Sequence, residues 1–140
     1  MRVLFDSSAF AKRYVEEKGS QEVDDLCQAT SVLALSVICV PEIISALNRL
    51  LREKSLSHQK YVSAKTHLFE DVADATIINL TPAVVAKSTL LLEKNDLCAM
   101  DALHVACAVE WGAELFVSSD RRQIRAARKA GLRTRYIETS

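Results

Sequence analysis

The chain has 140 residues with no net formal charge; 49% of the residues are hydrophobic and 26% are charged. This composition supplies enough apolar side chains for a buried core, and it argues against a disordered or fibrous protein. No apolar run approaches the ~20 residues of a membrane-spanning helix, so we expect no membrane insertion. The chain enters a strand-like segment directly after Met1, without an apolar leader, and we therefore expect a cytoplasmic protein.

The N-terminal segment predicts a buried strand followed by two helices. Val3–Phe5 is a short apolar run that stops at Asp6, which is typical of a strand buried on both faces. Residues 7–18 then carry apolar side chains at helical spacing, and we expect one helix that ends at Gly19. Ser20 is expected to cap the second helix.

The next segment predicts a second strand and two longer helices. Val32–Ser36 has the composition of a short buried strand. The amphipathic helix after it begins before or at Pro41, because proline is tolerated only in the first turn of a helix. Glu42 therefore lies near the N-terminus of that helix. Residues 57–72 predict another helix, with a serine as its N-cap.

A third strand and an unusually apolar helix follow. Ala75–Leu80 is rich in strand formers, and Pro82 then opens a helix that runs to about Glu93. The segment Cys98–Trp111 is apolar on almost every face, which is typical of a buried helix, and Gly112 is expected to end it.

The C-terminal segment completes an alternating pattern of strands and helices. Leu115–Val117 predicts a fourth strand, a basic helix runs to Ala130, and Thr134–Ile137 predicts a last strand at an edge of the sheet. This alternation predicts one α/β domain, residues 1–140, in which helices cover both faces of a mainly parallel sheet of four to five strands. The expected architecture is therefore a three-layer α/β/α sandwich.

Two of the predicted strands run directly into serine and aspartate residues. Val3–Phe5 is followed by Asp6, and Leu115–Val117 is followed by a Ser-Ser-Asp sequence that ends at Asp120. The strands of a parallel sheet point the same way, and ligands of open α/β sheets bind just beyond their carboxyl ends. We therefore expect Asp6 and Asp120 on one rim of the sheet. Asp6 could instead serve only as the cap of the next helix.

Two further acids lie in the first turns of predicted helices. Asp101 stands near the start of the otherwise apolar helix, and a carboxylate that enters the interior is costly unless a proton, a partner or a metal neutralises it. Glu42 has a similar place in the helix that follows Val32–Ser36. Each acid alone would also be explained by its favourable interaction with the positive end of a helix dipole.

Together the four acids indicate a cation site. Clustered carboxylates repel one another, and a hard divalent cation such as Mg²⁺ or Mn²⁺ takes up their charge. Such an ion activates water and polarises phosphoryl groups, which suits the hydrolysis of phosphodiester bonds. We expect Asp6, Asp101 and Asp120 nearest the metal and Glu42 to complete the site. His104 is expected to be buried and hydrogen-bonded, and it could orient a carboxylate.

The charge is distributed unevenly along the chain. Residues 1–120 hold 11 Lys and Arg against 17 Asp and Glu, whereas residues 121–140 hold 7 basic residues and one acid. An acidic body beside a basic end suits a protein that binds a cation and a polyanion next to each other. Arg121, Arg122 and Arg125 are therefore candidates for phosphate contacts. They could equally form the solvated face of an ordinary surface helix.

These residues resemble a known family. The chain is similar to PIN domains, and more closely to the small stand-alone PIN ribonucleases that act as toxins of VapBC-type toxin–antitoxin pairs. The resemblance covers nearly the whole length. It is carried by VLFDSSAFAKRY, PEIISAL, AMDALHVACA and LFVSSDRR, of which AMDALHVACA is the most specific. It implies a PIN-like fold, Mg²⁺- or Mn²⁺-dependent cleavage of RNA and a small antitoxin that blocks the site.

The resemblance also assigns roles to individual residues. The family's acidic quartet matches Asp6, Glu42, Asp101 and Asp120, and the common Thr or Ser two positions before the last acid matches Ser118. Asp6 and Asp101 correspond to the usual metal ligands. Relatives of this size usually form homodimers, which we also expect here. The sequence departs from the family where an arginine often precedes the third acid by three residues, because that position is Cys98.

Other functions remain open or are excluded by the residues. The same fold could bind RNA or a protein partner without cleaving it, with the acids serving only as helix caps. A haloacid-dehalogenase-type phosphatase needs a second aspartate two residues after the first, where this chain has Ser8. A phospho-receiver domain needs an aspartate at the end of its third strand, where this chain has Leu80 and Thr81.

Overall fold

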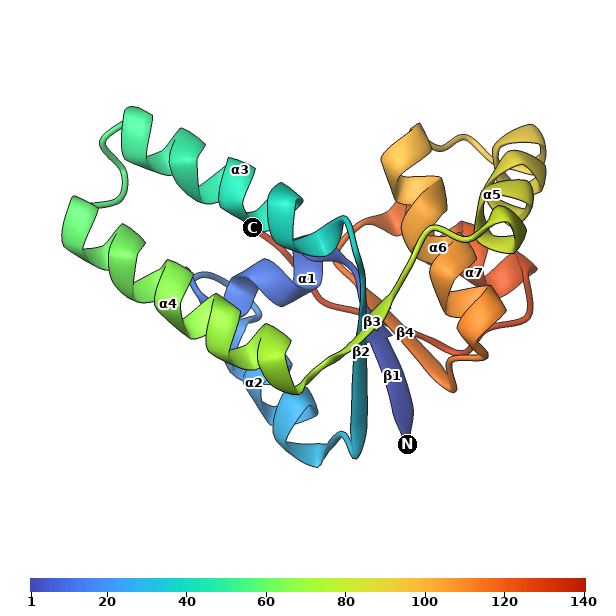
Figure 1. The fold of residues 1–140 in the computed structure, drawn as a ribbon, viewed down its shortest axis with the longest axis horizontal. Helices are drawn as coiled ribbons and strands as arrows, with labels where there is room; N and C mark the ends of the chain where they lie inside the picture. The colour runs from blue at the N-terminus through green and yellow to red at the C-terminus, as the bar shows by residue number, and fades with distance from the viewer.

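A five-stranded sheet runs through the middle of the molecule in a computed structural model that describes all 140 residues (Figure 1). Its strands are β1 (Arg2–Phe5), β2 (Val32–Ser36), β3 (Thr76–Ile78), β4 (Leu115–Ser118) and β5 (Thr134–Tyr136). The strand order is β3-β2-β1-β4-β5, and every neighbouring pair is parallel. The predicted parallel sheet is therefore confirmed, with five strands and with β5 at an edge.

Helices cover both faces of this sheet, as the alternating sequence pattern predicts. The helices are α1 (Ser7–Phe10), α2 (Ser20–Ala29), α3 (Cys39–Arg52), α4 (His58–Asp74), α5 (Pro82–Lys94), α6 (Ala99–Trp111) and α7 (Arg121–Lys129), with a 3-10 turn, η1, at Ala11–Arg13. The first four helices pack on one face, and α5, α6 and α7 pack on the other. In Figure 1, α3 and α4 lie on the left and α5 and α6 on the right.

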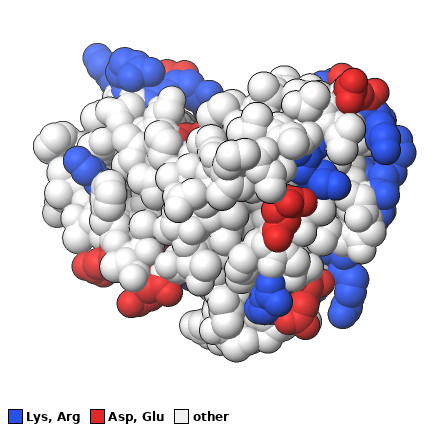
Figure 2. All heavy atoms as spheres, turned by 45° about the vertical axis from the view of Figure 1, so that its right-hand side comes forward, with Lys and Arg blue, Asp and Glu red and all other residues white.

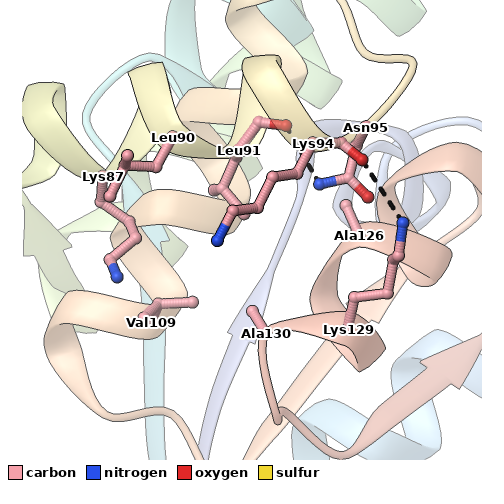
Figure 3. Close-up of a pocket in the computed structure, with 9 residues that line it drawn as sticks. All are labelled: Lys87, Leu90, Leu91, Lys94, Asn95, Val109, Ala126, Lys129 and Ala130. Carbon is pink, nitrogen blue, oxygen red and sulfur yellow. Dashed lines mark hydrogen bonds between the residues drawn. The ribbon is translucent and has the colours of Figure 1, made fainter.

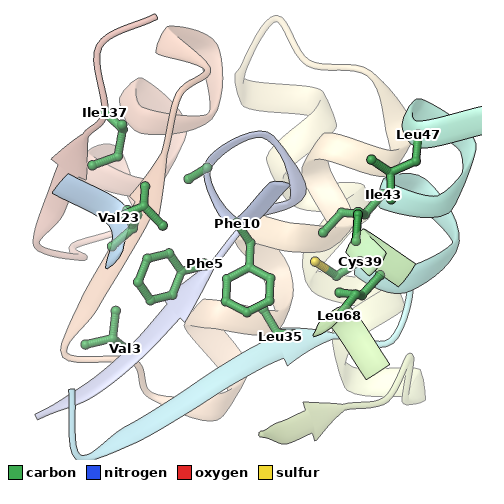
Figure 4. Packing of buried hydrophobic residues seen from close by; sticks show 13 residues of the cluster. Val3, Phe5, Phe10, Val23, Leu35, Cys39, Ile43, Leu47, Leu68 and Ile137 are labelled. Atoms are coloured by element: carbon green, nitrogen blue, oxygen red, sulfur yellow. The ribbon is translucent and has the colours of Figure 1, made fainter. Parts of the chain in front are cut away.

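The alternation of side chains along the strands produces two cores. Val3 and Phe5 of β1 point to the face covered by α1–α4, whereas Leu4, between them, points to the face covered by α5–α7. In the first core the rings of Phe5 and Phe10 pack with their centroids 5.7 Å apart (Figure 4). Because β1 is buried on both faces from Val3 onward, its sequence is apolar from Val3 to Phe5.

The order of the strands creates a switch point beside β1. From β1 the chain adds β2 and β3 on one side of the sheet, and it then crosses over to add β4 and β5 on the other side. The connections after β1 and β4 therefore leave the sheet in different directions at the carboxyl ends of two adjacent strands. Such a point is the usual position of a ligand crevice in an open α/β sheet.

The segment before α2 differs from the single helix predicted over residues 7–18. Helical structure ends at Arg13, and the chain then folds back on itself. Lys12 is buried, and its Nζ donates to Glu17 Oε1 at 2.7 Å and to the Lys18 carbonyl at 2.8 Å. A buried ammonium requires such partners, and a straight helix would carry both acceptors away from it. The helix predicted from the apolar spacing is therefore correct for residues 7–13 and wrong for residues 14–18.

Gly19 and Ser20 also have roles other than those predicted. Gly19 precedes α2 in a left-handed conformation, φ +94°, instead of ending a helix. Ser20 is the buried first residue of α2, and its hydroxyl accepts from the Glu17 N–H and donates to the Val15 carbonyl. It therefore stabilises the preceding loop and does not cap the helix.

Several element boundaries agree with the sequence patterns. Ser57 caps α4 by accepting from the Lys60 N–H at 3.1 Å, Pro82 is the first residue of α5, and Gly112 ends α6 with φ +75°. The third strand is shorter than predicted, because only Thr76–Ile78 pairs with β2.

No helix combines the length and the hydrophobicity that crossing a bilayer requires.

Gly19 and Gly131 allow steric crowding to be separated from backbone strain. Both have φ +94°, but a Cβ on Gly19 would lie 2.6 Å from Ile137 Cγ2, whereas a Cβ on Gly131 would contact nothing within 4 Å. We expect Gly131→Ala to cost about 1 kcal/mol of unfolding free energy from the left-handed backbone alone. Gly19→Ala should cost about 1–3 kcal/mol more, because Ile137 and the backbone after it must move to make room for the Cβ. Urea denaturation measures both, and equal losses would contradict this packing.

Candidate active site

A cavity of about 280 Å³ opens at the switch point and brings all four predicted acids together. Asp6 follows β1 directly, and Asp120 lies two residues beyond β4. Glu42 and Asp101 come from the first turns of α3 and α6. Four other polar residues share the lining, namely Ser7, Ser8, His104 and Gln123. Segments separated by more than 110 residues in the sequence therefore meet in one acidic pocket.

Asp6 is fully buried and accepts hydrogen bonds from three neighbours. The Ala9 N–H donates to Oδ1 at 3.0 Å, the Ser8 hydroxyl lies 2.9 and 2.8 Å from the two carboxylate oxygens, and the Ser118 hydroxyl donates to Oδ2 at 2.7 Å. Asp6 thus caps α1 and lines the cavity at once. Burial raises the pKa of Asp6 although these hydrogen bonds favour its ionised form.

Ser118, at the end of β4, connects two of the acids. Besides donating to Asp6, its hydroxyl accepts from the Asp120 N–H at 2.9 Å. The Asp120 side chain in turn caps α7 by accepting from the Arg122 N–H at 2.9 Å. The backbone that carries Asp120 is therefore held in place against the carboxylate of Asp6.

Glu42 is held as a carboxylate by two partners. The Ser7 hydroxyl donates to Glu42 Oε1 at 2.6 Å, and His104 Nε2 lies 2.5 Å from the same oxygen. Burial alone would raise the pKa of Glu42, but the hydrogen bonds from His104 and Ser7 outweigh it and lower the pKa below its usual value. His104 is buried, as predicted, and it orients a carboxylate of the cavity.

The surroundings of Asp101 shift its pKa in the direction opposite to that of Glu42. Burial raises its pKa, and the nearby negative charges, that of Asp120 above all, raise it further. Its one side-chain partner is Gln123, whose Nε2 donates to Asp101 Oδ1 at 3.1 Å and lies 3.5 Å from Asp120 Oδ2. The acids of α6 and α7 therefore repel each other across an amide that contacts both.

The chemistry of this lining fits a hydrated divalent cation. Mg²⁺ and Mn²⁺ prefer carboxylate oxygens, and a cation would relieve the repulsion that raises the pKa of Asp101. No three Asp, Glu, His or Cys side chains are already arranged to hold an ion between them. Mg²⁺ usually keeps several waters and binds through one or two carboxylates. The residues therefore fit a water-rich site and not a closed cage of side chains.

Sequence reasoning missed the polar partners of the acids. Ser7, Ser8 and Gln123 were not singled out, although Gln123 carries a signal, since it is a polar residue among Ile124, Ala126 and Ala127 on the buried face of α7. The three candidate arginines do not line the cavity. The guanidinium of Arg121 stacks on the Tyr136 ring, Arg122 lies 3.7 Å from Asp96, and Arg125 is exposed.

A larger cavity, of about 490 Å³, lies between α5, α6 and α7 (Figure 3). Leu90, Leu91 and Val109 contribute to its apolar lining, and Lys87, Lys94 and Lys129 are its charged side chains. It contains no acid, histidine, cysteine or hydroxyl group that could take part in catalysis. Chemical content and not size therefore places the candidate active site in the smaller, acidic cavity.

The repulsion around Asp101 predicts a pH-dependent gain in stability when its charge is removed. The raised pKa means that ionisation of Asp101 disfavours the folded state, so this cost develops as the pH rises above about 4. In metal-free buffer at pH 7 we expect Asp101→Asn to melt about 2–4 °C above the wild type. Near pH 3 the two proteins should melt together.

The control for this prediction is Glu93→Gln, which removes an exposed charge from α5. It should leave the melting temperature nearly unchanged at both pH values. A destabilised Asp101→Asn at pH 7 would show that the favourable interaction with the α6 dipole outweighs the repulsion.

Comparison with known proteins identifies the family. The family model of the PIN domain matches residues 3–129. Similar solved structures include PAE2754 from Pyrobaculum aerophilum (18% identity, 96% of this chain and 83% of that chain, TM-score 0.72). They also include VapC20 from Mycobacterium tuberculosis, a sarcin-ricin loop cleaving toxin (16%, 89% and 94%, 0.69). VapBC2 from Rickettsia felis, bound to a promoter DNA fragment, is another (13%, 97% and 98%, 0.69). No curated protein matches the chain. The chain belongs to the PIN domain family.

Proposed function

We propose that the protein is a metal-dependent endoribonuclease and the toxin of a VapBC-type toxin–antitoxin pair. The observation that carries the proposal is the convergence of Asp6, Glu42, Asp101 and Asp120 in one cavity at the switch point of a PIN domain. The similarity of the fold to VapC20, a toxin that cleaves the sarcin-ricin loop, supports RNA as the substrate.

In this proposal Asp6, Asp101 and Asp120 hold Mg²⁺ or Mn²⁺, and Glu42 completes the acidic shell. The bound ion would supply an activated water and neutralise charge on the scissile phosphate. The hydroxyl of Ser118 holds the carboxylate of Asp6 and the backbone of Asp120 in fixed positions relative to each other. The chain thus prepares a negatively charged pocket whose side chains are already oriented by hydrogen bonds.

Glu42 is suited to accept a hydrogen bond from water. Ser7 and His104 hold it in its ionised form, so it stays an acceptor at neutral pH. We assign it the role of orienting the attacking water, with His104 as a positioning residue that acts through Glu42.

The proposal includes RNA and protein partners. Helix α7 begins directly after Asp120 and carries Arg121, Arg122 and Arg125, which can contact the RNA backbone there. A cognate antitoxin is the expected inhibitor, consistent with the similar fold of a toxin–antitoxin complex from Klebsiella pneumoniae (16% identity, 87% of this chain and 89% of that chain, TM-score 0.67). Exposed Phe69 of α4 and Val85 of α5 offer apolar surface for the antitoxin or for a second copy in a homodimer.

The alternative is a PIN-like module that binds RNA or protein without cleaving it. Helix capping explains Asp6 and Asp120, which both accept from backbone N–H groups. It does not explain Glu42, whose carboxylate contacts Ser7 and His104 and caps no helix. The complete set of four acids therefore favours the enzyme.

Removing either of two carboxylates should abolish RNA cleavage. We expect Asp6→Asn and Asp101→Asn to lower the cleavage rate of structured RNAs in Mg²⁺ by at least about 100-fold, because each change removes charge from the metal site. Circular dichroism and melting curves should show folded proteins. Glu93→Gln should cleave as the wild type does, and EDTA should stop cleavage by the wild type. Retained activity in either aspartate variant would reject its assignment.

Calorimetry with Mn²⁺ separates the enzyme from the silent module. The wild type should bind Mn²⁺ with a measurable heat on titration, and Asp6→Asn should lose this binding, because Asp6 is one of the three proposed ligands. A module whose acids only cap helices would show no Mn²⁺ binding that depends on Asp6. The measurement needs no RNA and is therefore independent of the unknown cleavage sequence.

A further inference from the structure

A third cavity adjoins the acidic one and extends from it along α3. It has a volume of about 460 Å³ and shares Glu42 and Ala46 with the acidic cavity. Its other lining residues are Pro41, Ser45, Arg49, Arg52 and Met100. The two cavities therefore form one continuous depression, which we call the α3 groove where it lies beyond Glu42.

One face of α3 changes from acidic to basic along this depression. Glu42, Ala46, Arg49 and Arg52 follow one another at intervals of three or four residues and so lie on one side of the helix. At 1.5 Å per residue, Arg49 lies about 10 Å and Arg52 about 15 Å along the axis from Glu42. Figure 2 shows blue side chains gathered at the upper left, where Figure 1 places the end of α3.

Neither arginine is neutralised by the protein. Among the ion pairs of the structure, Arg13 contacts Asp24 and Asp71, and Arg135 contacts Glu22, but Arg49 and Arg52 pair with no acid. Both are exposed and line the groove. A free guanidinium is well suited to bind a phosphate through two hydrogen bonds.

We propose that the α3 groove binds the backbone of single-stranded RNA, with Arg49 and Arg52 as phosphate contacts that lead the strand to the acidic cavity. This inference rests on the proposed ribonuclease function. A strand that enters a pocket of four carboxylates is repelled there, and neighbouring phosphates must be held by cations to offset this. The α3 groove provides two such cations about two and three helical turns from Glu42.

Two exposed apolar residues of the groove suit contacts with bases. The side chain of Met100 is 42% exposed at the start of α6, and Pro41 is exposed at the start of α3. Unpaired bases stack on aromatic rings or on guanidinium planes, so Arg49 and Arg52 can contact bases as well as phosphates, with Met100 and Pro41 as apolar surface in the same groove. An acidic protein segment would share the attraction to the arginines, but only a nucleic acid would bring a phosphodiester bond to the acidic cavity at the end of the groove, as the proposed function requires. The groove therefore favours RNA.

The test compares RNA binding and cleavage by Arg49→Ala/Arg52→Ala with the wild type. With a mixed-sequence single-stranded RNA oligomer we expect at least about tenfold weaker binding, and a salt dependence whose slope falls by about 1.4, or 0.7 for each lost phosphate contact. Cleavage should show a raised KM and a kcat within about twofold, because the carboxylates are intact. Arg49→Lys/Arg52→Lys should recover most of the salt slope.

Lys87→Ala/Lys94→Ala is the matched control, because it removes two positive charges from the separate cavity between α5, α6 and α7. It should bind RNA with nearly the wild-type affinity. Equal losses in the two double variants would show a general charge effect, and unchanged binding by Arg49→Ala/Arg52→Ala would show that the strand takes another path. Either result overturns the proposal. Tighter binding of poly-glutamate than of RNA, lost in the same variant, would assign the groove to an acidic protein and would also overturn it.

The outcome is distinguishable from a failure of the proposed function. If the wild type cleaves RNA and the arginine variant behaves identically, only the path along α3 is wrong. If the wild type neither binds nor cleaves RNA, the ribonuclease assignment itself fails. Arg121→Ala/Arg122→Ala/Arg125→Ala, measured alongside, shows how much of the remaining salt dependence comes from α7.

Discussion

The buried carboxylate of Asp6 is the constraint on which the rest of the structure depends. A charge without exposure to water is tolerated only when hydrogen bonds or a cation compensate it. The Ala9 N–H fixes the start of α1, and the hydroxyl of Ser118 ties the end of β4 to the same carboxylate. The hydrogen bonds that make Asp6 tolerable therefore also place Asp120 beside it. The pocket and the centre of the sheet are stabilised by one set of interactions.

The pKa values of two acids in this pocket shift in opposite directions. Glu42 has direct donors, Ser7 and His104, and its pKa falls. Asp101 has an amide partner and acidic neighbours, and its pKa rises. The difference arises from contacts and not from depth, because both side chains are only partly buried. One acid is prepared to accept hydrogen bonds, whereas the other gains most from a cation.

Sequence patterns predicted the sheet and the meeting of the acids because both depend on local features. A short apolar strand followed by Asp, as at Val3–Phe5, indicates a buried strand and the residue at which it ends without any knowledge of its neighbours. The reversal after Arg13 was not predictable, since it depends on Lys12 finding acceptors across a loop. The contacts of Ser7 and Gln123 were missed for the same reason, because their partners are 35 and 22 residues away in the chain.

The pairing of β1 with β4 has a consequence for the synthesis of the protein. Val3 lies opposite Leu115, so β1 pairs with a strand that is made more than 110 residues later. Until the ribosome has released β4 and the start of α7, Asp6 lacks Ser118, and Asp101 lacks Gln123. A nascent chain that lacks this segment therefore carries an incomplete acidic cavity, which is assembled only after β4 and the start of α7 have joined the sheet.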